Sequence, residues 1–178
     1  SAIMLFNLGN LHFEEESQEA AVTSFKSAIE LYPNFRDAHR NLAVAMVQNN
    51  RVRDAEPHLR RALELGAQDG LTLGLLGYCH ESAGRPQAAL QAYRSATLTM
   101  PDEFQWRLGE GRVLIELDEL AAAASIFEEL LDKIPQQTGI WSHLADIRLQ
   151  QGSPALAIAD LEVARRLGFL LTRGAEPA

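Results

Sequence analysis

The sequence predicts an all-α fold, a stack of five helix-turn-helix repeats, and two periodic features carry this prediction. Alanine recurs every 34 residues, at Ala21, Ala55, Ala89, Ala123 and Ala157. A second column of small residues keeps the same interval, at Gly9, Ala43, Gly77, Gly111 and Ala145. A constant interval without insertion or deletion is typical of stacked repeats, so the chain of 178 residues is expected to form one solenoid domain over residues 2–171.

Each repeat is expected to contain two helices, and the repeats are expected at residues 2–35, 36–69, 70–103, 104–137 and 138–171. In the first helix apolar residues recur at helical spacing, as at Leu5, Leu8 and Leu11. Turn residues then separate the two helices, at Asn49-Asn50, Gly84-Arg85-Pro86 and Gly152-Ser153-Pro154. The second helix ends before a column of prolines, at Pro33, Pro101 and Pro135.

The small residues have a mechanical reason, because two helices approach closely only where their side chains are small. Larger residues four positions after each Ala are expected to fill the neighbouring grooves, at Phe25, Leu59, Tyr93, Phe127 and Leu161. Helices of about a dozen residues are marginal alone in water, so their stability has to come from stacking of each repeat on the next.

Composition and charge exclude several classes of protein. Sixteen basic and 24 acidic residues give a net charge of −8, which argues against a general nucleic-acid binder and against attraction to anionic membranes. No apolar stretch approaches the roughly 20 residues that a membrane span requires. The single cysteine, Cys79, cannot form an internal disulfide and is expected to be a buried, inert thiol.

The two ends of the sequence are expected to be less informative than the repeats. The chain begins at Ser1 without an initiator Met or a signal peptide, so Ser1 and Ala2 are either a cloning remnant or the start of an excised fragment. A cytoplasmic location is the default expectation. The tail at 172–178 lacks apolar periodicity and is expected to be frayed.

The repeated columns resemble the tetratricopeptide repeat (TPR) family, whose pattern is W-x2-L-G-x2-Y…A-x3-F…P. The fifth repeat offers Trp141-x2-Leu144-Ala145, and the third offers Leu76-Gly77 followed by Ala89, Tyr93, Ala96 and Pro101. The resemblance covers residues 2–171. It implies a right-handed superhelix whose first helices line a concave groove that binds a peptide or an extended segment of a partner protein.

The resemblance also places the residues of that groove. The expected peptide-binding residues lie on the first helices of four repeats: Phe6, Asn7, Asn10, Arg40, Asn41, Leu71, Leu75, Tyr78, Leu108 and Arg112. Phe13 and Val44 occupy further groove positions. Asn amides suit a peptide backbone because each offers both a donor and an acceptor. For Phe6 and Tyr78, packing in the core is an equally open interpretation, and for Leu75 it is the favoured one.

One branch of the family grips the C-terminal carboxylate of chaperones with two Asn and three basic residues. Its Asn positions correspond to Asn10 and Asn41, but its basic positions fall on Phe6, Leu71 and Leu75. The cationic groups that would hold a carboxylate are therefore missing, and this specific function is rejected while peptide binding is retained.

Glu110 departs from the family pattern, because it replaces the Leu of the fourth repeat. The favoured expectation is that this carboxylate leans toward solvent. The alternative is an ion pair with Arg107 or Arg112.

Catalysis, metal binding and cofactors find no support in the sequence. The five histidines form no HExxH motif, and His12 and His80 lie in the family's Tyr column, where a packed imidazole is expected. Cys79 and His80 are consecutive on a helix and point in different directions, which disfavours a nucleophile–base pair. Glu14-Glu15-Glu16 is expected to be a solvated turn. The chain is therefore expected to be a scaffold and no enzyme, without a cofactor.

Two further hypotheses remain open. The chain is alternatively an accessory, substrate-recruiting segment of a larger enzyme or of a secretion or assembly machine. In addition, the last helix carries Leu161, Val163 and Leu167, followed by Phe169-Leu170-Leu171, without a capping helix. This predicts exposed apolar surface and a weak homodimer through the C-terminal repeat.

Overall fold

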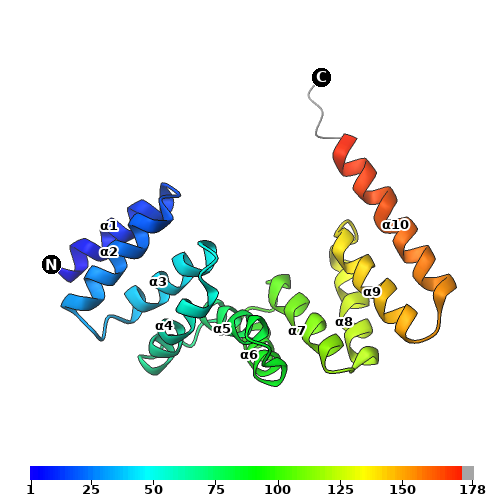
Figure 1. Ribbon diagram of the computed structural model, residues 1–178, viewed down its shortest axis with the longest axis horizontal. Helices are drawn as coiled ribbons and strands as arrows, with labels where there is room; N and C mark the ends of the chain where they lie inside the picture. Colours follow the sequence, from blue (N-terminus) through cyan, green and yellow to red (C-terminus); the bar gives the residue numbers. More distant parts are fainter. Residues whose placement is uncertain (174–178) are drawn as a thin grey trace. The chain divides into compact units, whose positions relative to one another are not determined.

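The computed structural model describes residues 1–173, with side chains through Gly168. Within these residues the chain forms ten α-helices and no strand, arranged as five helix-turn-helix pairs (Figure 1). The first helices of the five pairs are α1 (Ala2–Glu14), α3 (Arg36–Gln48), α5 (Gly70–Ser82), α7 (Phe104–Glu116) and α9 (Thr138–Gln150). The second helices are α2 (Gln18–Leu31), α4 (Val52–Glu64), α6 (Pro86–Thr99), α8 (Leu120–Lys133) and α10 (Pro154–Arg173). The predicted all-α solenoid is confirmed.

The turn inside every repeat has the same backbone geometry. Its second residue adopts the left-handed conformation, with φ between 57° and 74°, at Glu16, Asn50, Gly84, Asp118 and Gly152. The residue that follows donates its N–H to a carbonyl five residues earlier, as Ser17 does to His12 at 2.8 Å. This is the Schellman arrangement, which satisfies carbonyl groups at the end of a helix. Pro86 and Pro154 then open α6 and α10, where the missing N–H leaves no helical bond unmade.

The predicted Ala column forms the seam of the core. All five alanines, from Ala21 to Ala157, are completely buried. The larger side chains four residues later are also buried in the first four repeats, at Phe25, Leu59, Tyr93 and Phe127. The small residues therefore lie where helices approach most closely, as the packing argument requires.

Leu161 does not fill a groove as its counterparts do, and its exposure agrees with the exposed apolar surface predicted for the last helix. Leu161 is 46% exposed, because among the described residues no first helix of a further repeat packs against this face of α10. The column of Phe25 and Leu161 holds a large residue in every repeat, but this residue is buried only where the first helix of a following repeat packs against it.

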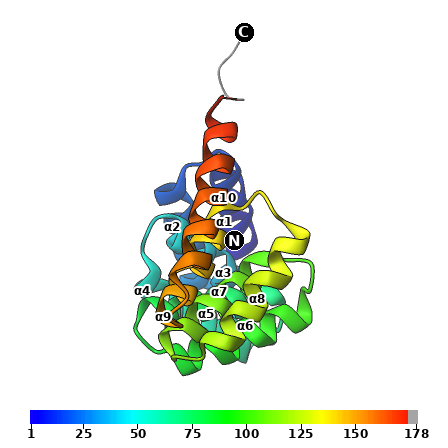
Figure 2. The ribbon, with the colours of Figure 1, turned by 90° about the vertical axis from the view of Figure 1, so that its right-hand side faces the viewer.

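The chain divides into two compact units, the first from Ser1 to Asp102 and the second beginning at Glu103. In the first unit α1 to α6 pack in sequence, and α3 also contacts both α1 and α5. In the second unit α7 packs on α8, α8 on α9 and α9 on α10. Figure 2 shows α10 continuing beyond its partner α9. Helix α10 extends to Arg173, two residues past the predicted end of the last repeat, and 174–178 lie outside the described residues.

The favoured expectation for Glu110, that its carboxylate leans toward solvent, is wrong. The side chain is buried, with 4% of the residue exposed, and its Oε2 accepts a hydrogen bond of 2.8 Å from Nη1 of Arg107. Arg107 also donates to Glu129 on α8 at 2.7 Å. A buried carboxylate needs a charged partner, so the alternative, an ion pair with Arg107, is the one the structure adopts.

Candidate functional site

A pocket of about 170 Å³ lies where the first helices of three repeats meet. Phe13 on α1, Asn41 and Val44 on α3, and Leu71 on α5 line it. Three of the four side chains are apolar, and Asn41 contributes the amide. Such a pocket can take one apolar side chain of a ligand and orient it by a hydrogen bond.

Asn41 is held in place by two hydrogen bonds. Its Nδ2 donates to Oδ1 of Asn10 on α1 at 2.8 Å, and its Oδ1 accepts from Nε of Arg40 at 3.4 Å. Arg40 in turn lies 3.6 Å from a carboxylate oxygen of Asp69, just before α5. These contacts link α1, α3 and the start of α5, and they fix the direction in which the two amides point.

Phe6 and Leu75 contribute mainly to the core. Both are half-buried and pack against the buried cluster that α2, α3, α4 and α5 form. The ring of Phe6 contacts the rings of Phe25 and Phe35, with centroids 5.8 and 4.8 Å apart. Both side chains therefore pack against the core, and because each is only half-buried, their role in peptide binding stays a prediction.

Three other predicted groove residues are exposed. Asn7 lies on α1, and Leu71 and Tyr78 lie on α5, two helical turns apart. Leu71 is 36% and Tyr78 is 37% exposed. They are accessible to a partner.

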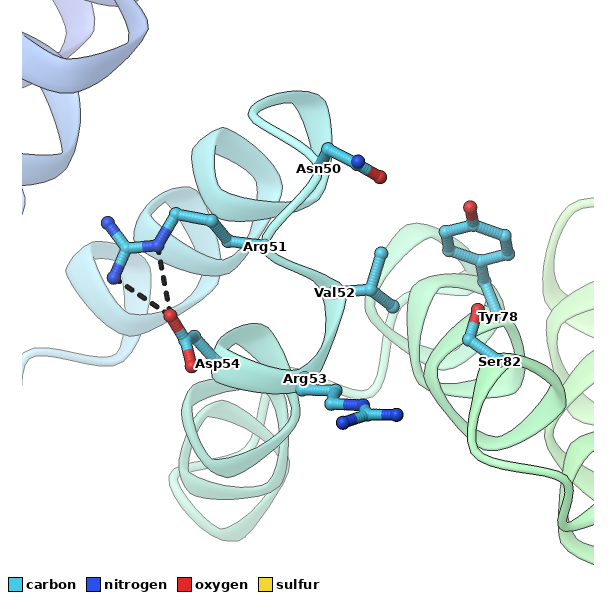
Figure 3. A pocket seen from close by; sticks show the side chains of 7 residues that line it. All are labelled: Asn50, Arg51, Val52, Arg53, Asp54, Tyr78 and Ser82. Carbon is cyan, nitrogen blue, oxygen red and sulfur yellow. Dashed lines mark hydrogen bonds and ion pairs between the residues drawn. The ribbon is translucent and has the colours of Figure 1, made fainter.

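A second pocket, of about 330 Å³, lies between the α3–α4 turn and α5 (Figure 3). Its lining residues are Asn50, Arg51, Val52, Arg53, Asp54, Tyr78 and Ser82. Figure 3 shows the guanidinium group of Arg51 turned away from α5 toward Asp54, with which it makes an ion pair of 2.8 Å, whereas Arg53 extends toward α5. Tyr78 therefore lies beside a polar, basic edge.

The sequence predicts Tyr78 as a groove residue, but it does not predict the turn residues beside it. Asn50 and Arg53 lie at and just after a turn, and the register of the family places contact residues only on the first helices. The signal available in the sequence was the pair of arginines next to the break at Asn49-Asn50.

Leu108 and Arg112 lie on α7, in the second unit, one helical turn apart, and both are half-buried. Arg112 is the counterpart of Tyr78 in the third repeat, and Leu108 is the counterpart of Gly74, which is buried on α5. Their register on α7 is the one that the family assigns to the groove, and their role in partner binding stays a prediction.

Cys79 and His80, the two residues that could suggest a catalytic pair, are both buried. Cys79 is buried, its Sγ donates to the carbonyl oxygen of Val52 at 3.4 Å, and burial raises the pKa of the thiol to about 11. His80 is buried as expected, and burial lowers its pKa. Across the described residues, no group of three or more His, Cys, Asp or Glu side chains could hold a metal ion. The part of the chain that the structure describes also contains no helix long and apolar enough to cross a bilayer.

Sequence profiles agree with the repeat architecture. Two profiles described as "Tetratricopeptide repeat" match residues 40–104 and 81–147, and one described as "TPR repeat" matches residues 9–50. Together these matches include residues of all five repeats.

Curated relatives share the repeats over most of this chain but are much longer. Protein O-mannosyl-transferase Tmtc3 of Drosophila melanogaster is 32% identical over 150 residues, which cover 82% of this chain and 16% of the relative. Anaphase-promoting complex subunit 3 of Schizosaccharomyces pombe is 24% identical over 159 residues, which cover 89% of this chain and 24% of the relative. The chain thus spans less than a quarter of either relative, and these matches do not favour the accessory-segment alternative over a general scaffold.

Solved structures show the same fold. YrrB, described as a TPR protein with an unusual peptide-binding site, superposes with a TM-score of 0.84 at 20% identity, covering 94% of this chain and 86% of that one. MamA superposes with a TM-score of 0.85 at 15% identity, covering 99% of this chain and 97% of that one. The helix pairs, the profile matches and these structures lead to one conclusion: the chain belongs to the tetratricopeptide repeat family, whose fold supports protein interaction.

Proposed function

We propose that the chain is a non-catalytic scaffold that holds an extended segment of a partner protein along the first helices of its first three repeats. The pocket lined by Phe13, Asn41, Val44 and Leu71 carries this proposal. It is mostly apolar, and its one amide is oriented by hydrogen bonds with two neighbouring side chains.

The Asn10–Asn41 pair suits a peptide backbone. The bond between them uses the carbonyl oxygen of Asn10 and one N–H of Asn41, and each amide has a further N–H to donate. A backbone carbonyl beside α1 and α3 would accept from these groups while the adjoining side chain enters the pocket. The likeness to YrrB, which is described as having a peptide-binding site, supports the same class of ligand.

The proposed site in the first unit consists of the predicted groove residues Phe6, Asn7, Asn10, Arg40, Asn41, Leu71, Leu75 and Tyr78. Within this set, Asn7, Leu71 and Tyr78 are the exposed contact residues. Phe6 and Leu75, which pack against the buried cluster, support them. Leu108 and Arg112 are proposed as contact residues of the second unit on register alone. A net charge of −8 favours a neutral or basic partner segment over an acidic one.

Two exposed leucines of the third repeat provide a matched test. Leu71 lies on α5 in the pocket, and Leu98 lies on α6, outside it. Peptides selected from a displayed random library are titrated against the wild type, Leu71→Asp, Leu98→Asp and the double variant Asn41→Ala with Tyr78→Ala. We expect Leu71→Asp and the double variant to lose at least about tenfold in affinity, and Leu98→Asp to bind as the wild type does.

Thermal unfolding followed by circular dichroism verifies that each variant is folded. Equal affinity of all four folded proteins for the selected peptides would place the binding surface elsewhere.

We also propose weak self-association through the last repeat. Leu161 on α10 is 46% exposed, and Ile158 on the same helix is 59% exposed. Phe169, Leu170 and Leu171, which the same expectation includes, have side chains outside the described residues.

A further inference from the structure

The interface between successive repeats is built from two recurring pairs of positions. In the first unit Val22 and Phe25 on α2 share one buried cluster with Leu42 and Ala45 on α3, and each of the four is at most 2% exposed. The second helix of one repeat thus presents two apolar positions, and the first helix of the next repeat covers them.

The same positions are exposed at both ends of the chain. On α10, four repeats after Val22 and Phe25, Ile158 is 59% and Leu161 is 46% exposed. On α1, one repeat before the α3 pair, Leu8 is 41% and Leu11 is 50% exposed. Each end therefore carries one half of the interface that the repeats use between themselves.

The two halves carry apolar side chains of the kind found at the interfaces between repeats. Leu8 has the same side chain as its counterpart Leu42 on α3. Leu11 is larger than its counterpart on that helix, but the same column holds Ile147 on α9, where the opposing helix α8 contributes Phe127. Leu161 is smaller than Phe127, but Ile158 is larger than Ala124, its counterpart on α8, so the contact between copies has to make room for one larger side chain than the α8–α9 interface holds.

We propose that the chain self-associates end to end, with α10 of one copy packing against α1 of the next. This deepens the self-association proposed above and is independent of the peptide groove. The contact joins two different surfaces, so it is heterologous and adds further copies instead of stopping at a dimer. A contact between two helices is small beside the roughly 1,200 Å² that a stable interface buries, so we expect the association to be weak.

Single aspartates can block each end separately. Leu11→Asp blocks α1, and Ile158→Asp blocks α10. Glu56 occupies the column of Ile158 in the second repeat, but there it forms an ion pair with Arg85, whose counterpart in the first repeat is Ser17. An aspartate at 158 would therefore lack that partner in the next copy.

Leu156→Asp is the matched control for the substitution on α10. Leu156 is 54% exposed, and it lies in the column where the second repeat carries the exposed Asp54. An aspartate in this column is therefore compatible with an intact contact between repeats.

Sedimentation velocity over a concentration series tests the proposal. We expect the average mass of the wild type and of Leu156→Asp to rise with concentration, and to rise further with added salt, which screens the repulsion between acidic copies. Leu11→Asp alone and Ile158→Asp alone should stay monomeric. Their mixture should form dimers and nothing larger, because one intact α1 and one intact α10 remain.

Three outcomes would overturn the proposal. A wild type that stays monomeric at every concentration would exclude self-association altogether. Dimers of Leu11→Asp alone would indicate an α10–α10 contact, and loss of association in Leu156→Asp would place the contact outside the repeat interface. Since Leu71→Asp is expected to leave the average mass unchanged, a failure of the groove is distinguishable from a failure of this contact.

Discussion

Gly111 on α7 lies directly against the ring of Phe127 on α8: a Cβ atom built on Gly111 would be 2.7 Å from Cζ and 2.8 Å from Cε1 of that ring. The ring cannot move aside easily, because it is completely buried and stacks on His143 with centroids 5.0 Å apart. The other repeats follow the same rule, in which glycine faces an aromatic ring and alanine stands where the large residue is leucine. The glycine pairs are Gly9–Phe25 and Gly77–Tyr93, and the alanine pairs are Ala43–Leu59 and Ala145–Leu161.

Gly111→Ala is therefore expected to destabilise the protein. Overpacking costs about 1–3 kcal/mol, and the helix propensity of alanine returns less than about 1 kcal/mol of it. Denaturant unfolding measures the net loss. In a Phe127→Leu background the same change recreates the Ala–Leu pair and should cost less than in the wild type. Gly139→Ala on α9 is the control, because nothing lies within 4 Å of its Cβ position. A Gly111→Ala variant as stable as Gly139→Ala would contradict the steric argument.

The sequence predicts the fold well because the fold is periodic. The interval of 34 residues locates the helices, the seam from Ala21 to Ala157 and the turns, since each is repeated five times in the same register. The groove follows only from the family register. What periodicity misses are features that occur once: the pocket beside the α3–α4 turn, and the polar pairs that occupy apolar columns, such as Arg107–Glu110. The spacing of three residues between Arg107 and Glu110 was the available signal for that pair.

Replacing this ion pair by leucines tests how much it contributes. Arg107→Leu alone removes a partner of the buried Glu110 and is expected to cost about 2–4 kcal/mol of unfolding free energy. Arg107→Leu together with Glu110→Leu recreates Leu73 and Leu76 of the third repeat and is expected to be neutral or stabilising. Chemical denaturation of the two variants measures both values. A double variant less stable than Arg107→Leu alone would show that the carboxylate is needed in this column for another reason.

The left-handed turn residues offer a gain in stability. Glu16 has φ = 57°, a conformation that glycine adopts without the steric cost of a Cβ. Glu16→Gly is therefore expected to raise the free energy of unfolding by about 0.5–1 kcal/mol. Asn50→Gly should gain less, because Asn tolerates this conformation better. Glu15→Gly, at φ = −79°, should gain nothing. Denaturant midpoints of the three variants provide the comparison, and a gain at Glu15 equal to that at Glu16 would contradict it.

A histidine pair makes stability depend on pH. Nδ1 of His39 on α3 lies 3.0 Å from Nδ1 of His58 on α4, and Nε2 of His39 lies 2.9 Å from the carbonyl oxygen of Pro33. A carbonyl only accepts, so His39 carries its hydrogen on Nε2, and its Nδ1 accepts from His58. Burial lowers the pKa of His58 to about 4; the nearby His39 and Lys26 act in the same direction, and Asp54 opposes them.

The direction of the pH effect follows from the folded and unfolded pKa values of His58. The unfolded chain takes up a proton on His58 near pH 6.5, whereas the folded chain does so only near pH 4, so stability is fully present above about pH 6.5 and is lost as the pH falls toward 4. Because His58 is partly exposed, we expect a loss of about 1–2 kcal/mol, less than the full linkage value. Denaturant unfolding at a series of pH values measures the slope. His58→Ala, which recreates Ala92 of the third repeat, should flatten it and leave the smaller contribution of His80, whose pKa is also lowered by burial. An equal slope in the wild type and His58→Ala would assign the pH dependence to other groups.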